Sequence, residues 1–136
     1  MREHARWWIL SAKRDLERAR HSLEIGDRVG AVFWSQQAAE KALRGLLLHF
    51  KGGFPETHII RRLFEELGYN LGLSEEELEA AYELTQYYHL SRYPDIVEGV
   101  PDDVPDEAIS RKSAGEAVAI ASRIVEASER AVEEED

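Results

Sequence analysis

The stretch from residue 33 to residue 50, FWSQQAAEKALRGLLLHF, constrains the fold more than any other part of the chain. At helical spacing its apolar side chains occupy several faces, and a ridge of small residues runs beside them. A helix that is apolar on most sides is interior, and small side chains let a neighbouring helix approach closely. The stretch therefore predicts a central helix, with these residues on one buried face: Val32, Ala39, Leu43, Leu46 and Phe50.

One strip of this helix is polar and consists of Gln37, Glu40, Lys41 and Arg44. Residues three or four positions apart on a helix are neighbours, so these side chains lie within reach of one another. Because the helix is expected to be interior, the strip needs water, protein partners or a ligand.

The other helices are indicated by apolar stripes and by their end signals. An apolar stripe predicts a first helix over residues 3–25, ended by Gly26, and the central helix is expected to reach about Lys51. Pro55 follows the break, and Thr57 is expected to cap a short helix over residues 58–67 that ends at Gly68.

Two further helices complete the predicted fold. Ser74 and Glu77 form a capping box for a helix that is expected to run to about Arg92, where Pro94 disfavours continuation. Asp106 is expected to cap the last helix. The sum is an all-α fold, an antiparallel up-and-down four-helix bundle with one short additional helix. At 136 residues we expect one domain over 1–136, with its core at about 5–130 and an acidic tail at 131–136.

Composition excludes several classes of protein and site. The chain has no cysteine, which rules out disulfides and thiolate chemistry, and no apolar run approaches the roughly 18 residues of a membrane span. No export signal is recognised, so we expect a cytoplasmic protein without a membrane partner. The five histidines do not stand at metal-ligand spacing, and no glycine-rich phosphate loop is present, so we expect no metal and no cofactor.

Charge is distributed unevenly along the chain. Residues 1–62 hold 12 basic and 7 acidic residues, a net of +5, whereas residues 63–136 hold 5 and 20, a net of −15. A basic first half either faces phosphates or pairs with the acidic second half inside the fold, and charge alone leaves both open.

The densest group of unusual side chains is the stretch 87–95, YYHLSRYPD. It combines the guanidinium of Arg92, the imidazole of His89, several phenols and the carboxylate of Asp95, which is what stacking on a base and holding a phosphate require. The alternative is structural: the tyrosines belong to the core, and Arg92 neutralises a helix C-terminus.

The order of these elements resembles the HEPN family, the higher eukaryote and prokaryote nucleotide-binding domain. The resemblance runs from about Ala5 to Val125 and is carried by these residues: a Trp-rich first helix running into Ala12 and Asp15-Leu16, Gln36-Gln37-Ala38-Ala39-Glu40-Lys41-Ala42-Leu43, Thr57-His58 after Pro55, and Arg92-Tyr93-Pro94-Asp95. It implies a four-helix bundle with a short additional helix. It also implies a homodimer, and pairing with a minimal nucleotidyltransferase in a toxin–antitoxin system.

Family members that are metal-independent ribonucleases carry a histidine four to six residues after the arginine. In this chain Arg92 matches the arginine, but Val97, Glu98 and Gly99 follow at that distance, and His89 lies on the other side. Histidine is the usual acid or base for such cleavage, so the departure favours a binding module over an enzyme.

Three functions therefore stay open. The preferred one is a non-catalytic module that binds a nucleotide or RNA phosphate, or docks a nucleotidyltransferase, without DNA specificity, using Arg92, Tyr93, Asp95, Lys41, Arg44, Gln37, Trp34 and His58. The second is an endoribonuclease toxin in which His89 or His58 replaces the missing base beside Arg92. The third is a structural oligomer, in which Trp34 only packs, His58 only anchors the third helix, and Lys41 and Arg44 pair with Glu40 or with acids of the second half.

Overall fold

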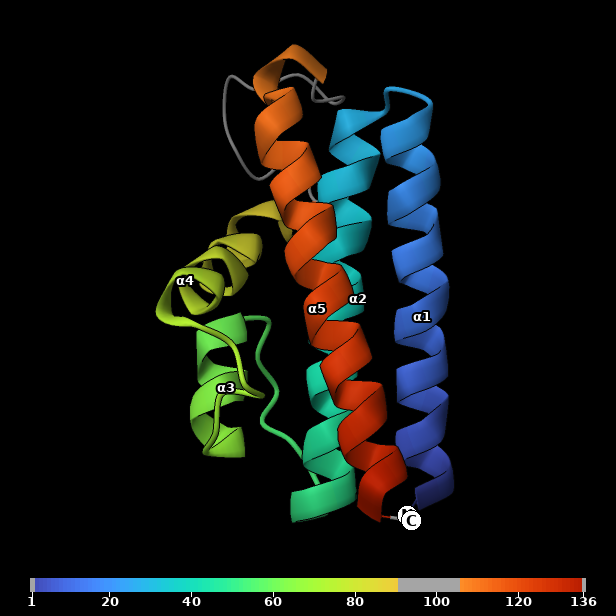
Figure 1. Cartoon of the computed structure of the whole chain (residues 1–136), viewed down its shortest axis with the longest axis vertical. Coiled ribbons are helices and arrows are strands. Elements are labelled where there is room, and N and C mark those ends of the chain that lie inside the picture. The colour runs from blue at the N-terminus through green and yellow to red at the C-terminus, as the bar shows by residue number, and fades with distance from the viewer. Residues whose placement is uncertain (1, 91–105, 136) are drawn as a thin grey trace.

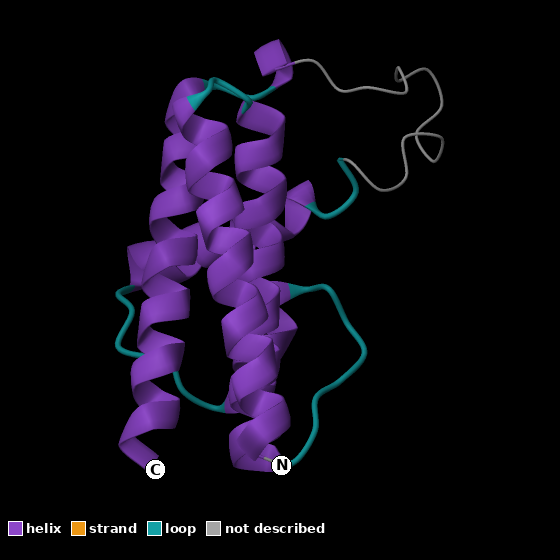
Figure 2. Ribbon diagram, turned by 90° about the vertical axis from the view of Figure 1, so that its right-hand side faces the viewer, coloured by secondary structure: helices purple, strands orange, loops and turns teal. Residues whose placement is uncertain are grey.

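Three long helices lie side by side and form the body of the molecule (Figure 1). They are α1 (Arg2–Glu24), α2 (Arg28–Lys51) and α5 (Arg111–Glu135). The computed structural model describes residues 2–90 and 106–135, and no strand occurs in these two ranges. Two short helices, α3 (Ile60–Leu67) and α4 (Glu75–Glu83), pack on the side of α2 and α5 away from α1. Both chain ends lie at the same end of the bundle (Figure 2).

The prediction of an all-α antiparallel bundle is confirmed, but the helix that starts after Ser74 is shorter than expected. Instead of reaching residue 92, α4 ends at Glu83 and continues as the 3₁₀ turn η1 (Leu84–Tyr87). The tighter turn buries Leu84 and Tyr87 and places the Thr85 hydroxyl where it accepts a hydrogen bond from Ile60 N at 3.0 Å. The fourth side of the bundle is therefore built from α3, α4 and η1 together.

The central position of α2 is confirmed, because most of its length is buried between α1 and α5. A Cβ on Gly45 would lie 3.0 Å from Ile9 Cδ1 and 3.1 Å from the backbone oxygen of Ala5, so α1 crosses α2 closely at this point. One residue was wrongly placed: Phe50 is 37% exposed, because it lies in the last turn of α2, beyond the main core.

Most predicted helix ends are confirmed. Gly52 adopts a left-handed conformation with φ 80° and closes α2 by donating its N–H to Leu48 O. Gly26 and Gly68 follow α1 and α3 with φ of 81° and 87°. Ser74 and Glu77 form the reciprocal capping box at the start of α4.

Two predicted helix starts were wrong. Thr57 does not cap α3, because α3 begins at Ile60 and has no side-chain cap. The Thr57 hydroxyl instead accepts a hydrogen bond from Ile59 N. Asp106 begins the 3₁₀ turn η3 (Asp106–Ala108) and its carboxylate accepts from Val29 N, while Ser110 Oγ accepts from Ser113 N at the start of α5.

The last helix extends close to the end of the described residues, because α5 continues to Glu135. Val132 is only 4% exposed and belongs to the core, which explains why the helix persists there.

Among the described residues, no helix combines the length and apolarity needed to cross a lipid bilayer.

Candidate functional site

The polar strip of α2 meets α1 on one flank and residues 57–58 and 88 on the other, which produces two groups of paired side chains. Each group is organised by one buried carboxylate. The first, called the Asp15 group, contains Asp15, Arg18, Lys41 and Ser11. The second, called the Glu40 group, contains Glu40, Gln36, Gln37, Arg44, His58 and Tyr88.

In the Asp15 group, α1 supplies a carboxylate that is completely buried. Arg18 donates to Asp15 Oδ1 at 2.6 Å, one turn along the same helix. Lys41 Nζ lies 2.8 Å from Oδ2 as an ion pair, but its hydrogen bond goes to Ser11 Oγ at 3.0 Å. Within the described residues Oδ2 accepts no hydrogen bond, so the charge of Lys41 compensates for the missing donor.

In the Glu40 group, α2 supplies a carboxylate that is 3% exposed and receives three donors. Gln36 Nε2, itself fully buried, donates to Oε2, and Arg44 Nη2 lies 2.7 Å from Oε1. His58 Nδ1 also lies 2.7 Å from Oε1, and this contact ties the segment before α3 to α2. His58 therefore anchors the segment before α3, as the structural alternative held.

The Arg44 guanidinium is enclosed by aromatic rings. Its carbon Cζ lies 5.6 Å from the ring centroid of Trp8 and 5.2 Å from that of Phe54, and Nη2 also donates to the backbone oxygen of Thr57. The side chain is 17% exposed. Stacking and ion pairing together hold Arg44 in place, so its charge reaches solvent only in part.

His58 is the more accessible cation candidate, with 44% of its side chain exposed. Its ring stacks on Tyr88 with centroids 3.8 Å apart, and the Tyr88 hydroxyl lies 2.8 Å from Nε2. His89 is exposed and its ring meets Tyr88 from another direction, with centroids 4.8 Å apart. Both histidines that the sequence named as candidate bases therefore contact Tyr88.

Trp34 belongs beside the Asp15 group. The Arg18 guanidinium lies 5.1 Å from its ring centroid, and Phe33 contacts it edge-on. Gln37 donates to Gln36 Oε1 and so extends the Glu40 group along α2.

The remaining predicted site residues, Arg92, Tyr93 and Asp95, lie outside the described residues. Of the predicted set, the structure brings together Gln37, Arg44 and His58 in the Glu40 group, and Lys41 lies next to them on α2.

The expected pairing of the basic first half is partly confirmed. Arg44 pairs with Glu40 as one alternative held, whereas Lys41 pairs with Asp15, an acid of the first half. Pairing with the second half occurs elsewhere, where Lys13 of α1 lies 2.6 Å from Glu129 of α5.

Sequence reasoning did not place Asp15 or Gln36 in the candidate site, and it named Tyr88 only as one of the phenols of the stretch 87–95. A signal for the first two was present, because Asp15 stands between Ala12 and Ala19 on the apolar stripe of α1 and Gln36 occupies an equivalent buried position on α2. A polar residue at a core position of a stripe requires a buried partner.

The two groups leave a positive surplus. Within residues 2–90 and 106–135, Arg18, Lys41 and Arg44 form ion pairs with two carboxylates, Asp15 and Glu40, and His58 adds a further charge when protonated. In the part of the chain that the structure describes, no three histidine, cysteine or acidic side chains gather as metal ligands. The arrangement is thus suited to an anion.

Comparison with known proteins shows the family to which this fold belongs. The model of the HEPN domain matches residues 5–131. The chain belongs to the HEPN domain family. Three solved structures are similar over nearly the whole chain. TT1696 from Thermus thermophilus is 36% identical with a TM-score of 0.76, covering 93% of this chain and 96% of its own.

The second, ST0689, is described as an archaeal HEPN homologue. It is 33% identical with a TM-score of 0.71, and the match covers 94% of this chain and 97% of ST0689. The third, a HEPN domain protein (tm0613) from Thermotoga maritima, is 29% identical with a TM-score of 0.69, and the match covers 93% and 97%. No curated protein matches the chain. The HEPN domain family is generally related to nucleotides and RNA.

Proposed function

We propose that this HEPN protein is a non-catalytic module that binds the phosphate of a nucleotide or of RNA at the Asp15 and Glu40 groups. The observation that carries the proposal is the charge balance: three permanent cations share two carboxylates, both of which are buried. A carboxylate sealed from water holds its cations at fixed positions, and groups fixed in advance lose less entropy when a ligand binds.

Lys41 and His58 are the groups expected to meet the phosphate. Their side chains are 26% and 44% exposed, and they come from opposite flanks of the polar strip of α2. Arg92, Tyr93 and Asp95 remain predicted contributors, the first to the phosphate and the second to stacking on a base. Arg92 stands four positions after Tyr88 in the sequence.

The test is a fluorescence polarisation titration with a labelled short RNA and with ATP as competitor, at low salt. Lys41→Gln removes one cation and retains a polar end for Ser11, and we expect it to weaken binding about 10- to 100-fold, the value of one charge-assisted hydrogen bond. Lys112→Gln is the matched control. It removes the same charge from α5, where the side chain is 86% exposed.

The control variant should change affinity less than about twofold, because exposed distant charges are screened. Circular dichroism confirms that both variants are folded. If both variants weakened RNA binding equally, the effect would come from the net charge of the protein and not from a site at Lys41. Absence of wild-type binding to any nucleotide or RNA would remove the proposal.

One observation favours the alternative activity as an endoribonuclease. Glu40 contacts Nδ1 of His58, so Nε2, which lies 2.8 Å from the Tyr88 hydroxyl, is the nitrogen that would act as the general base. Incubation with RNA tests this, because cleavage that persists in both His58→Gln and Arg92→Ala comes from a contaminant.

Pairing with a minimal nucleotidyltransferase in a toxin–antitoxin system remains a prediction from the family resemblance, as does a cytoplasmic location. Co-expression with the product of an adjacent nucleotidyltransferase gene, followed by gel filtration, tests the pairing directly. Separate elution of the two proteins would contradict it.

A further inference from the structure

The end of the bundle opposite the chain termini has a cavity of about 370 Å³, formed where three helix ends meet. Figure 1 shows that α2 and α5 both begin at this end, whereas α1 finishes there. No member of the Asp15 or Glu40 groups lines the cavity. Its lining residues come from the last turn of α1, the turn that follows it, and the first positions of α2 and α5: Leu23, Glu24, Gly26, Arg28 and Arg111.

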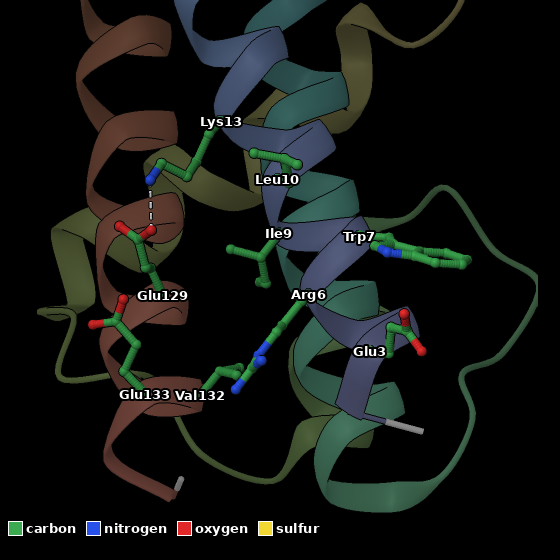
Figure 3. A pocket seen from close by; sticks show the side chains of 9 residues that line it. All are labelled: Glu3, Arg6, Trp7, Ile9, Leu10, Lys13, Glu129, Val132 and Glu133. Carbon is green, nitrogen blue, oxygen red and sulfur yellow. Dashed lines mark hydrogen bonds and ion pairs between the residues drawn. The ribbon is translucent and has the colours of Figure 1, made fainter.

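The two arginines of the cavity have no partner in the described part of the chain. Arg28 is partly buried and Arg111 is exposed, and neither side chain forms an ion pair or a hydrogen bond with another residue of 2–90 or 106–135. Figure 3 shows the opposite case in the groove between α1 and α5 near the chain ends, where Lys13 reaches Glu129 at 2.6 Å. The two guanidinium groups are therefore available to a ligand.

The position of the arginines favours a bound anion. A helix carries partial positive charge at its N-terminus, so acidic residues are usual in the first turn, as at Glu75, Glu76 and Glu77 of α4. The first turns of α2 and α5 contain no acidic residue, and each helix begins with an arginine. Two helix N-termini and two guanidinium groups thus place positive charge around one cavity, and a bound phosphate would stabilise this arrangement.

Two nearby carboxylates already serve the start of α2. Asp27 accepts a hydrogen bond from Gly30 N at 2.8 Å, and Asp106 accepts one from Val29 N at 3.1 Å. Glu24 is the one acidic residue among those that line the cavity, and within the described residues it forms no ion pair with either arginine. A carboxylate only accepts hydrogen bonds, so Glu24 can hold a hydroxyl group of the ligand.

We propose that this cavity binds the terminal phosphate monoester of a nucleotide, with Arg28 and Arg111 on the phosphate and Glu24 on a ribose hydroxyl. The nucleotide is either free or the 5′ end of an RNA, because both present the same chemical group. A phosphate monoester carries about two negative charges near neutral pH, whereas an internal phosphodiester carries one, so two arginines favour the terminal group. The volume of the cavity falls in the range of small-molecule sites, roughly 300–1,000 Å³.

This cavity is separate from the phosphate site proposed at the Asp15 and Glu40 groups. Arg28 precedes Lys41 by 13 positions on α2, which corresponds to about 20 Å along the helix axis. The inference therefore goes beyond the proposed function, and either site can be lost while the other is retained.

Isothermal titration calorimetry with the four nucleoside 5′-monophosphates tests the site, and the four nucleosides are the ligands without phosphate. The wild-type protein and Lys41→Gln are titrated in parallel, since Lys41→Gln weakens the other proposed site. Arg28→Gln and Arg111→Gln, each added to Lys41→Gln, should weaken binding of the monophosphate about 10-fold or more, because each removes a charge-assisted hydrogen bond.

Lys112→Gln, added in the same way, is the matched control. Lys112 follows Arg111 in α5, but its side chain is 86% exposed and does not line the cavity. It should change the affinity less than about twofold. If Lys41→Gln bound no monophosphate, or if Lys112→Gln weakened binding as much as the two arginine variants, the proposal would be overturned. The RNA titration of the wild-type protein judges the other site independently.

Thermal melting followed by circular dichroism separates a ligand contact from a structural role. Neither arginine loses a partner, and removal of a positive charge from a helix N-terminus should leave the melting temperature unchanged or raise it slightly. Weaker binding at an unchanged melting temperature supports the site. Weaker binding only in variants that melt earlier would contradict it.

The source of the phosphate is distinguished with one short RNA that carries either a 5′ phosphate or a 5′ hydroxyl. If RNA ends occupy the cavity, the 5′ phosphate should strengthen binding about 10-fold, and Arg28→Gln should remove this gain. If free nucleotides occupy it, the two RNAs bind equally and the monophosphate still binds. Either result supports a site for terminal phosphate, whereas absence of both effects refutes it.

Discussion

Replacement of Glu40 is the perturbation whose magnitude the structure determines best. Glu40→Ala removes the acceptor of three donors, and the donors differ in their access to water. Gln36 is completely buried, so its amide would be left unpaired, at about 1–3 kcal/mol. Arg44 is 17% exposed and recovers part of its solvation, and His58 is 44% exposed and recovers most of it.

These contributions place Glu40→Ala at about 3–5 kcal/mol, the range for one partner removed from a buried ion pair. Unfolding of a chain of 136 residues carries an entropy of roughly 2.1 cal/mol/K per residue, so the melting temperature should fall by about 10–17 °C. Glu40→Gln retains the volume and one carbonyl acceptor for the buried Gln36 amide. Its loss should be smaller, at about 1–2 kcal/mol.

The assay is urea unfolding of the two variants, with Glu126→Ala as the control. Glu126 is a helical glutamate that is 54% exposed and lies 3.8 Å from Arg20, so its removal should cost less than about 1 kcal/mol. The reasoning is refuted if Glu40→Ala and Glu126→Ala lose the same free energy of unfolding. Equal losses for Glu40→Ala and Glu40→Gln would also contradict it, since the buried amide would then not matter.

The remaining predictions concern helix packing and capping, each measured by urea unfolding. Gly45→Ala should destabilise by about 1–3 kcal/mol because its Cβ meets α1 at 3.0 Å, whereas Gly115→Ala on α5 meets nothing within 4 Å and should stabilise by about 0.5–1 kcal/mol. Ser74→Ala breaks the capping box and should cost about 1 kcal/mol. The hydrogen bond from Arg123, followed by that from the Ser74 backbone, lowers the pKa of Glu77 from 4.5. The contribution of ionised Glu77 to the free energy of unfolding is therefore full above pH 4.5 and is lost as pH falls through the lower folded pKa. Glu77→Gln should make the free energy of unfolding depend less on pH below about pH 4.5.

Periodicity predicted the helices well because burial of an apolar stripe dominates the stability of each one. The long helices and the glycine ends of α1, α2 and α3 follow from residues that are close in sequence. Thr57 was assigned wrongly because α3 begins only at Ile60, and Asp106 because its carboxylate has a partner outside its own segment. Asp106 bonds Val29 N, which is 77 residues away, and no local pattern contains that information.

The candidate site was predicted only in part for a related reason. The polar strip of α2 was visible in the sequence, but helical spacing identifies a face without identifying what covers it. Asp15 covers Lys41 from α1, and His58 reaches Glu40 from the segment before α3. The positions of Asp15 and Gln36 on buried faces were the available signals, and they indicate only that some partner exists.

The same side chains of α2 serve both the core and the proposed site, so stability and binding must be separated residue by residue. Glu40 and Asp15 are buried, and variants there lower stability whatever the protein binds. His58 is exposed over nearly half of its side chain, and glutamine keeps an amide donor for Glu40, so His58→Gln should lower stability less than Glu40→Ala and still remove a phosphate contact. If His58→Gln loses RNA binding without a large loss of stability, that result would be specific evidence for a ligand site. Glu40→Ala cannot give such evidence, because a ligand site and a purely structural network both predict that it loses stability and binding together.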